Sequence, residues 1–417
     1  MIRALSMALL LAAAATAAAQ ERASSVGAAL LADPSVKAVL DHAQKGEAQV
    51  LEDQVRLCEI PAPTFHEEAR AAAVRPLFES LGLQNVRIDA AGNVLGDRPG
   101  RGARPHVVIA AHLDTVFPEG TDLHVRREGA FLKGAGIGDN CRGLAALIGI
   151  IRALHEAPVE TPGTITFVAN VGEEALGNSK GVRYLFDTGM KGDIDRFVSI
   201  DGSGIGFTRV GVGTRRERVT FKGPGGHSYY SFGSANPIHA LGRALAKIAD
   251  LQVPRDPRTT FSVGRVGGGT SINAIATEAW MEVDTRSHDA AALQAVDQAV
   301  RQAVAEAVRE ENARWGGRAP VESVWQDLGT HLPGATAADS AIVQATVSVT
   351  QALGLPIKIF PGTTDSNVPM ALGIPAVTLD GGGDGSGGHS PGEVFDTTDS
   401  WKGTARALLL ALALAQP

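Results

Sequence analysis

The residues best placed to do chemistry end the stretch VVIAAHLDTVF, Val107–Phe117. The stretch begins as an apolar, β-branched run, which is typical of a strand buried in a sheet. Side chains alternate along a strand, so His112 and Asp114 at its end point the same way. An imidazole can bind a metal, and a carboxylate two residues on can orient it. The alternative is a strand-end pair that only hydrogen-bonds a loop, and this motif alone leaves both interpretations open.

Two other apolar strands, Thr164–Val171 and Arg196–Ile200, also end in acidic residues. Open α/β sheets place their sites at the carboxyl ends of their strands, so we expect these ends to form one rim of one sheet. The loops GAGIGD and GGHSPGE add a carboxylate and an imidazole. Together the candidate site residues are His112, Asp114, Asp139, Glu173, Glu174, Asp201 and His389.

Two imidazoles with several carboxylates and no thiolate suit zinc, and also manganese or cobalt. The set is too rich for one tetrahedral ion and suits two ions that share one bridging carboxylate. Two metals about 3.5–4 Å apart can hold a bridging hydroxide and polarise a carbonyl. One carboxylate must then stay off the metals as a general base. The adjacent residues Glu173 and Glu174 offer both roles, ligand and base.

The elements that must position these residues follow an α/β pattern. Helical spacing over Val36–Leu57 and His66–Leu81 predicts two helices, and Val86–Leu95 predicts a short strand with a turn inside it. Asn140–Leu154 is apolar on most faces, which predicts a buried helix. The same pattern resumes near the C-terminus, with a helix over Ser340–Leu353, a strand over Ala376–Leu379 and a C-terminal helix.

Alternating strands appear between these two parts of the chain. The expected elements are, in order, a strand at Arg216–Lys222, a helix at Asn236–Leu251, strands at Thr259–Val266 and Glu278–Arg286, a helix at Ala290–Trp315 and a strand at Val321–Trp325. This β-α-β-β-α-β order is the ferredoxin-like unit. It predicts a second domain, residues 208–328, inserted into a site-bearing domain of residues 21–207 and 329–417. A chain of 417 residues is long enough for about two domains.

Composition restricts the partners and the compartment. The net charge is −7 with no basic run, which argues against nucleic-acid binding. Met1–Ala19 has a basic start, an Ala/Leu-rich core and an A-x-A ending, which predicts a signal peptide cleaved before Gln20. The alternative is an N-terminal membrane anchor, for which the run is short. We therefore expect an exported protein, periplasmic or secreted, that has no membrane partner after cleavage.

The two cysteines and a glycine run have simpler interpretations. Export permits a disulfide between Cys58 and Cys141, but one pair is no disulfide framework, so we expect two small buried thiols. The run Gly381–Gly388 lacks the Lys-Ser/Thr pair of a phosphate loop and leads to no helix. We interpret it as backbone that makes room beside His389.

The motifs HLDTVF, GAGIGDN, GEEALGNSKG, GHS, GTTDSN and HSPGE occur together in this chain. In combination they resemble the co-catalytic dizinc exopeptidases, the family of peptidase T, carboxypeptidase G, aminoacylases and acetylornithine deacetylase. The resemblance runs from about Leu51 to the end. It implies an α/β catalytic domain, an inserted domain that acts as a lid and in dimerisation, and two zinc ions per chain.

The resemblance also implies a role for each candidate in the first domain. Glu173 would be the general base, Asp114 would orient His112, and the peptide bond after Asp139 would be cis. The sequence DNCR, which starts at the bridging residue, departs from many relatives, while Asp201 in IDGSG resembles the di- and tripeptidases. The implied metal ligands are His112 and Asp201 on one ion, Glu174 and His389 on the other, and Asp139 between them.

Three residues of the inserted domain resemble substrate-contacting groups. His227 resembles a histidine that stabilises the oxyanion, in many members from the partner subunit, and Asn273 and Arg286 resemble residues that contact the substrate and its carboxylate. Their alternatives stay open: GHS could be a simple turn, and Arg286 could be a solvated residue paired with Asp284.

These observations predict an exported dizinc metallopeptidase that cleaves an amide bond near a free terminus of a small peptide. One alternative is an N-acyl-amino-acid deacylase of the same fold, which would share the chemistry. Another is an exported binding protein with a dead site, which the presence of Glu173 and a complete ligand set argues against.

Overall fold

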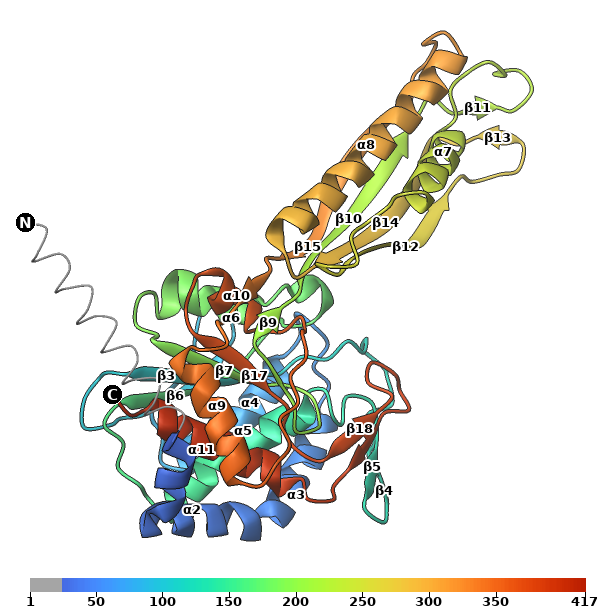
Figure 1. Ribbon diagram of the computed structural model, residues 1–417. Helices are drawn as coiled ribbons and strands as arrows, with labels where there is room; N and C mark the ends of the chain where they lie inside the picture. The colour runs from blue at the N-terminus through green and yellow to red at the C-terminus, as the bar shows by residue number, and fades with distance from the viewer. Residues whose placement is uncertain (1–24) are drawn as a thin grey trace, which may run out of the picture. The chain divides into compact units, whose positions relative to one another are not determined.

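The computed structural model describes residues 25–417, so the predicted signal peptide lies outside the described residues. The chain forms two compact units, which are described separately (Figure 1). The first runs to Val210 and resumes at Ala335–Pro417, and the second is Gly211–Gly334. In residues 25–417, no helix is both long enough and apolar enough to cross a membrane.

A mixed seven-stranded sheet forms the centre of the first unit, in the order β1-β2-β6-β3-β7-β17-β8. The strands β6, β3, β7 and β17 run parallel to one another, whereas β1, β2 and β8 pair antiparallel with their neighbours. This arrangement confirms the predicted α/β class with a mixed sheet. The strand bounds are β1 Gln84–Ile88, β2 Val94–Arg98, β3 His106–His112, β6 Thr164–Asn170, β7 Arg196–Ile200, β8 Phe207–Thr208 and β17 Ala376–Leu379.

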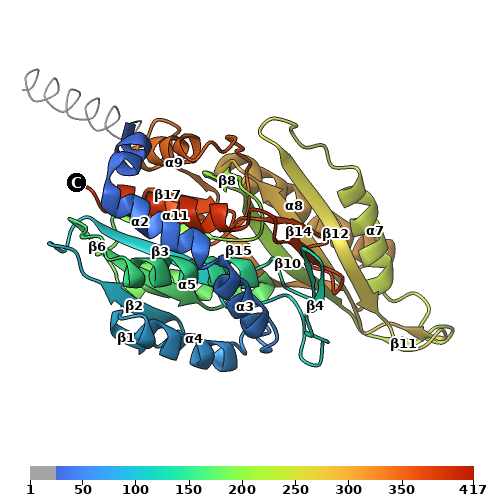
Figure 2. The same ribbon diagram turned by 90° about the horizontal axis from the view of Figure 1, so that it is seen from below.

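Helices cover both faces of this sheet, which explains why β3 is apolar on both sides. Val107 and Ile109 pack in the large core under the helices, and Val108 and Ala110 pack in a smaller core on the other face. Figure 2 shows α2, α5 and α11 over the same face. The helix bounds are α2 Pro34–Lys45, α3 Glu47–Cys58, α4 Glu68–Ser80, α5 Cys141–Glu156, α6 Lys180–Tyr184, α9 Ala341–Ala352, α10 Asn367–Ala371 and α11 Trp401–Leu414.

Two local predictions were wrong in this unit. The single helix expected over Val36–Leu57 is broken at Gly46, which ends α2 and begins α3. The turn expected inside Val86–Leu95 is present, but it joins two antiparallel strands, β1 and β2, where one strand was expected. This turn is built by Asp89, whose carboxylate accepts backbone N–H groups of the next residues, and by a positive φ at Gly92.

The expectation of two free thiols was also wrong. Cys58, the last residue of α3, and Cys141, the first residue of α5, form a disulfide with a Cα–Cα distance of 5.4 Å. Both residues are fully buried. The sequence could not show that the packing of α3 on α5 brings these two helix ends together.

The second unit has the predicted β-α-β-β-α-β order. Its antiparallel sheet has the order β12-β14-β10-β15, and α7 and α8 pack on one face, where Val219, Met281 and Val304 are buried. The short strands β11 Gly226–His227 and β13 Ala274–Ile275 pair beside it. The other bounds are β10 Gly213–Lys222, α7 Pro237–Ala249, β12 Thr259–Gly268, β14 Glu278–Ser287, α8 Ala290–Arg314 and β15 Glu322–His331.

Candidate metal centre

Neighbouring parallel strands bring the predicted residues of the first unit to one edge of the sheet. His112 is the last residue of β3, and Asp201 directly follows β7. Glu173 and Glu174 follow β6, the other neighbour of β3. Potential ligand atoms lie within 4.8 Å of one another in three groups: His112 with Glu173 and Glu174, His112 with Asp139 and Asp201, and Asp139 with Glu174 and His389.

Asp139 lies between the two imidazoles. Its Oδ1 is 3.2 Å from Nε2 of His112, and its Oδ2 is 3.1 Å from Nε2 of His389. The first imidazole also lies 3.6 Å from Asp201, and the second lies 3.3 Å from Glu174. Each oxygen of Asp139 therefore faces a different histidine–carboxylate pair, which is the arrangement a bridging ligand requires. The peptide bond after Asp139 is cis, as the resemblance implied.

The polar atoms of this cluster fit metal ions better than they fit one another. Nε2 of His112 and Oδ1 of Asp139 are buried, and no hydrogen-bond partner for either lies among the described residues. Buried polar atoms are nearly always paired, so two such orphans facing one point are suited to a cation. The donors are nitrogen and oxygen without sulfur, which suits zinc, manganese or cobalt.

The charges of the cluster favour the same conclusion. Burial raises the pKa of Glu174 and of Asp201, and it raises that of Glu173 well above its ordinary value. Hydrogen bonds to Asp139 and Glu174 raise the pKa of His389 to about 10. Crowded carboxylates that draw protons onto nearby groups form a site with a deficit of positive charge, which bound cations would supply.

Asp114 contacts both His112 and the backbone of the acidic pair. It is fully buried, and its carboxylate accepts the backbone N–H groups of Glu173 and Glu174 at 3.0 and 2.9 Å and the hydroxyl of Thr64 at 2.9 Å. Its Oδ1 lies 3.4 Å from Nδ1 of His112, which also lies 3.1 Å from the Asp114 carbonyl oxygen. One side chain thus fixes both the imidazole and the acidic pair.

Sequence reasoning missed Glu393, the last residue of the HSPGE motif. Its buried carboxylate accepts the backbone N–H groups of Gly136, Gly138 and Asp139 at 2.9–3.1 Å. A Cβ at Gly138 would meet Glu393 Oε1 at 2.7 Å, so a larger residue there would displace the carboxylate from the loop. Glu393 therefore ties the loop that carries Asp139 to the segment that carries His389.

Sequence reasoning also left the GTTDSN motif without a role. Its Asp365 is fully buried and accepts a 2.6 Å hydrogen bond from Asn170, the register partner of His112 on β6. Burial raises the pKa of Asp365 to about 7. The motif therefore contacts the carboxyl end of β6 through Asp365. Its spacing in the sequence did not predict this contact.

The other predicted residues lie in the second unit. His227 on β11 is exposed and pairs in register with Ala274 on β13, while the carbonyl of Asn273 accepts the N–H of Ser228 at 2.9 Å. Arg286 on β14 donates from Nε to Asp284 at 2.7 Å, which is the pairing that its alternative interpretation expected. The proposed substrate roles of His227, Asn273 and Arg286 stay predictions.

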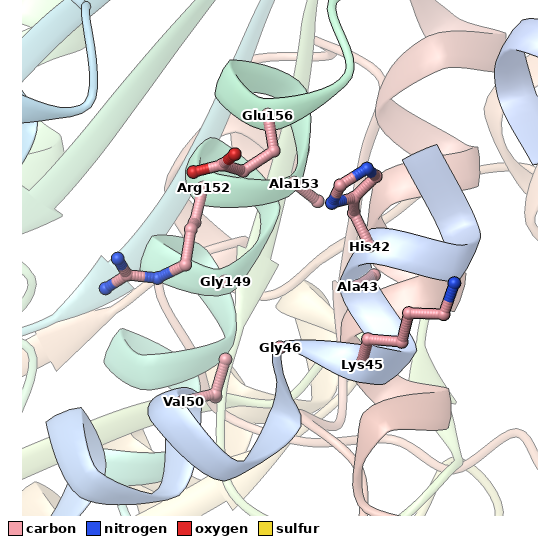
Figure 3. Close-up of a pocket in the computed structure, with 9 residues that line it drawn as sticks. All are labelled: His42, Ala43, Lys45, Gly46, Val50, Gly149, Arg152, Ala153 and Glu156. Carbon is pink, nitrogen blue, oxygen red and sulfur yellow. The ribbon is translucent and has the colours of Figure 1, made fainter. Parts of the chain in front are cut away.

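A cavity of about 180 Å³ lies elsewhere in the first unit, between α2, α3 and α5 (Figure 3). None of its lining residues is a predicted site residue. The side chains of Lys45 and Arg152 point away from each other, so they do not converge on a ligand.

The mixed α/β fold and the cluster of potential metal ligands at its strand ends are together typical of a metal-dependent hydrolase. The chain belongs to peptidase family M20/M25/M40, whose sequence profile matches residues 108–413. It is 26% identical over 348 residues to a succinyl-diaminopimelate desuccinylase of Corynebacterium glutamicum, which covers 81% of this chain and 89% of the relative.

Two solved structures share the fold. A tripeptidase of Staphylococcus aureus superposes with a TM-score of 0.72 at 21% identity, over 88% of this chain and 98% of that one. The YXEP protein of Bacillus subtilis, described as a dinuclear metal-binding peptidase of the M20 family, superposes with a TM-score of 0.65 at 19% identity, over 88% and 98% of the two chains. Membership of this family indicates a peptidase or deacylase activity that depends on a metal centre.

Proposed function

We propose that this chain is a dizinc exopeptidase that hydrolyses an amide bond of short peptides, with manganese or cobalt as other possible metals. The placement of Asp139 between two histidine–carboxylate pairs carries the proposal. His112 and Asp201 would hold one ion, Glu174 and His389 the other, and Asp139 both. When bound, such ions polarise a carbonyl and lower the pKa of water.

Glu173 is the general base in this proposal. Glu174 lies 3.3 Å from His389, which supports Glu174 as the ligand of the pair and Glu173 as the residue for proton transfer. Burial raises the pKa of Glu173, and a carboxyl group of raised pKa is suited both to take a proton from attacking water and to return it to the leaving amine. Asp114 holds the backbone of this residue in place.

The second unit supplies substrate contacts in this proposal. His227 would donate to the oxyanion, Asn273 would contact the substrate, and Arg286 would grip its free carboxylate with the two parallel hydrogen bonds that a guanidinium can form. The resemblance supports a homodimer through the inserted unit, with His227 acting in the partner's site. The first 19 residues support export to the periplasm or beyond.

An N-acyl-amino-acid deacylase is the second candidate, and the identity to a desuccinylase over 81% of the chain favours it. Both reactions cleave an amide bond next to a carboxylate-bearing residue, so the same centre serves either one. An exported binding protein without activity fits less well, because the ligand set and Glu173 are intact.

A substrate panel tests the proposal. Di- and tripeptides and N-acyl amino acids are offered to the chain loaded with zinc, manganese or cobalt, with Glu173→Ala as the control for contaminating hydrolases. We expect turnover of short peptides that is lost in the control. Faster turnover of the acyl amino acids would assign the deacylase, and no turnover of either class would overturn the proposed function.

A further inference from the structure

Phe65, beside the metal centre, is held in an unfavourable conformation. Its φ is +76°, in the left-handed region that bulky side chains rarely adopt, and its ring is 46% exposed. A residue in such a conformation persists only where its surroundings impose it, and such residues gather at functional sites. The ring is thus presented to solvent at a conformational cost.

The contacts that hold Phe65 come from the centre itself. Its N–H donates to Oε1 of Glu67 at 3.0 Å, and the same oxygen accepts the N–H of Gly172 at 3.0 Å, one residue before Glu173. On the other side, Thr64 donates to Oδ2 of Asp114. The segment that carries Phe65 is therefore fastened both to the end of β3 and to the loop that carries the acidic pair.

Leu176 is a second exposed apolar side chain on that loop. It lies in the 3-10 turn Ala175–Gly177, two residues after Glu174, and is 55% exposed. Oδ2 of Asp114 accepts both the Thr64 hydroxyl and the N–H of Glu174, each at 2.9 Å. Phe65 and Leu176 thus project from two segments that meet at one carboxylate oxygen.

Two acidic side chains near Phe65 and Leu176 are turned away from solvent. Glu67 and Asp114 are buried, and they accept hydrogen bonds from backbone N–H groups and from the Thr64 hydroxyl. The large apolar side chains that the two segments expose are a phenyl ring and an isobutyl group, and the exposed residues His66 and Glu68 follow Phe65. An apolar ligand group packed on Phe65 and Leu176 would remove both side chains from water.

We propose that Phe65 and Leu176 form an apolar subsite for the side chain next to the cleaved amide bond. The substrates are then short peptides or acyl amino acids with a large apolar residue, such as leucine or phenylalanine, at that position. This inference rests on the proposed function, and it adds the substrate class.

Matched substrates test the subsite. Substrates that differ only in Leu, Phe, Ala, Asp or Lys at this position are compared for wild type, Phe65→Ala, Leu176→Ala and the conservative Phe65→Tyr. We expect wild type to prefer Leu and Phe. Each alanine variant should lose roughly 10-fold or more in kcat/KM on these substrates and less than about threefold on Ala, because lost apolar contacts in a pocket discriminate by about 10–200-fold. Phe65→Tyr should keep the preference.

Phe131→Ala is the matched control, since this ring is 44% exposed on β5 Phe131–Lys133 and outside the proposed subsite. It should change neither substrate series. Metal content and melting temperature, measured for every variant, separate loss of the subsite from loss of the fold.

A binding readout separates the failure of this inference from the failure of the proposed function. Calorimetry with free leucine and free alanine should show a preference for leucine that Phe65→Ala and Leu176→Ala both abolish. Absence of turnover on every substrate, with that binding preference intact, would overturn the hydrolase and leave the subsite. A wild type without apolar preference, or a preference that survives both alanine variants, would overturn the subsite.

Discussion

At the scale of single residues, the centre is built from two kinds of side chain. His112, Asp139, Glu174, Asp201 and His389 offer candidate ligand atoms, whereas buried carboxylates such as Asp114 and Glu393 hold the backbone that carries them. These candidates were predictable because each follows an apolar strand or stands in a glycine-rich loop. Glu393, Glu67 and Asp365 were not, because their partners are backbone or amide groups of segments far away in the sequence.

The division of roles within the acidic pair is testable at this scale. Glu173→Ala should keep two metals per chain by elemental analysis and lose about 10²–10⁴ or more in kcat, since general-base catalysis is worth that much. Glu174→Ala is the matched comparison and should lose one metal. A Glu173→Ala chain that retains only one ion would show that the two roles are interchanged.

At the scale of elements, α4 and β3 are joined by one buried guanidinium. Arg70 on α4 is fully buried and donates to the carbonyls of Leu113, Ile60 and Cys58, and Leu113 lies between two site residues. Burial lowers the pKa of Arg70 to about 10, so the group is still charged at neutral pH. The end of β3 therefore depends on a side chain from another element.

Arg70→Ala should lower the free energy of unfolding of the first unit by roughly 3–5 kcal/mol, because it leaves buried carbonyls without donors. Arg70→Lys should recover only part of this, since an ammonium lacks the planar fork. Arg75→Ala on the same helix removes an exposed pair with Glu79 and should cost less than about 1 kcal/mol. Equal effects of Arg70→Ala and Arg75→Ala in urea unfolding would contradict the role of Arg70.

The second unit carries a pH-dependent contact between β10 and α8. Burial is the main cause that raises the pKa of Glu217 to about 7, and the charge of Asp297 is the second. Arg301 pairs with Glu217. Glu217 therefore binds a proton more tightly in the folded state than in the unfolded chain, and its contribution to stability falls as pH rises from about 4.5 to 7.

Glu217→Gln should make that fall shallower. The melting temperature of the second unit, followed from pH 5 to pH 8, should decrease less in this variant than in wild type. Glu322→Gln, at the exposed start of β15, serves as the control and should follow wild type. A Glu217→Gln profile that coincides with wild type would show that this carboxyl group does not govern the pH dependence.

The periodicity of the sequence predicted most elements but not their breaks. The strands β3, β6 and β7 and the helices α5, α7 and α8 lie within a few residues of their predicted ranges. The break at Gly46, the hairpin of β1 and β2 and the Cys58–Cys141 disulfide depend on turn chemistry or on contacts between distant segments. Hydrophobic spacing alone does not encode those contacts.

At the scale of the whole molecule, the chain is one α/β unit interrupted by a ferredoxin-like unit. The interruption is compatible with both folds because the inserted unit begins on β10 and ends on β15, which pair side by side, with Thr214 opposite His331. The chain therefore leaves the second unit close to where it entered. Both parts of the first unit contribute to the metal centre, His389 from the second part and the other candidates from the first.

Anomalous scattering from crystals grown with zinc tests the central claim most directly. We predict two zinc peaks about 3.5–4 Å apart, one between His112 and Asp201, the other between Glu174 and His389, with Asp139 touching both. A single peak at saturating zinc, or peaks that lie away from Asp139, would contradict the dinuclear centre on which the proposed function depends.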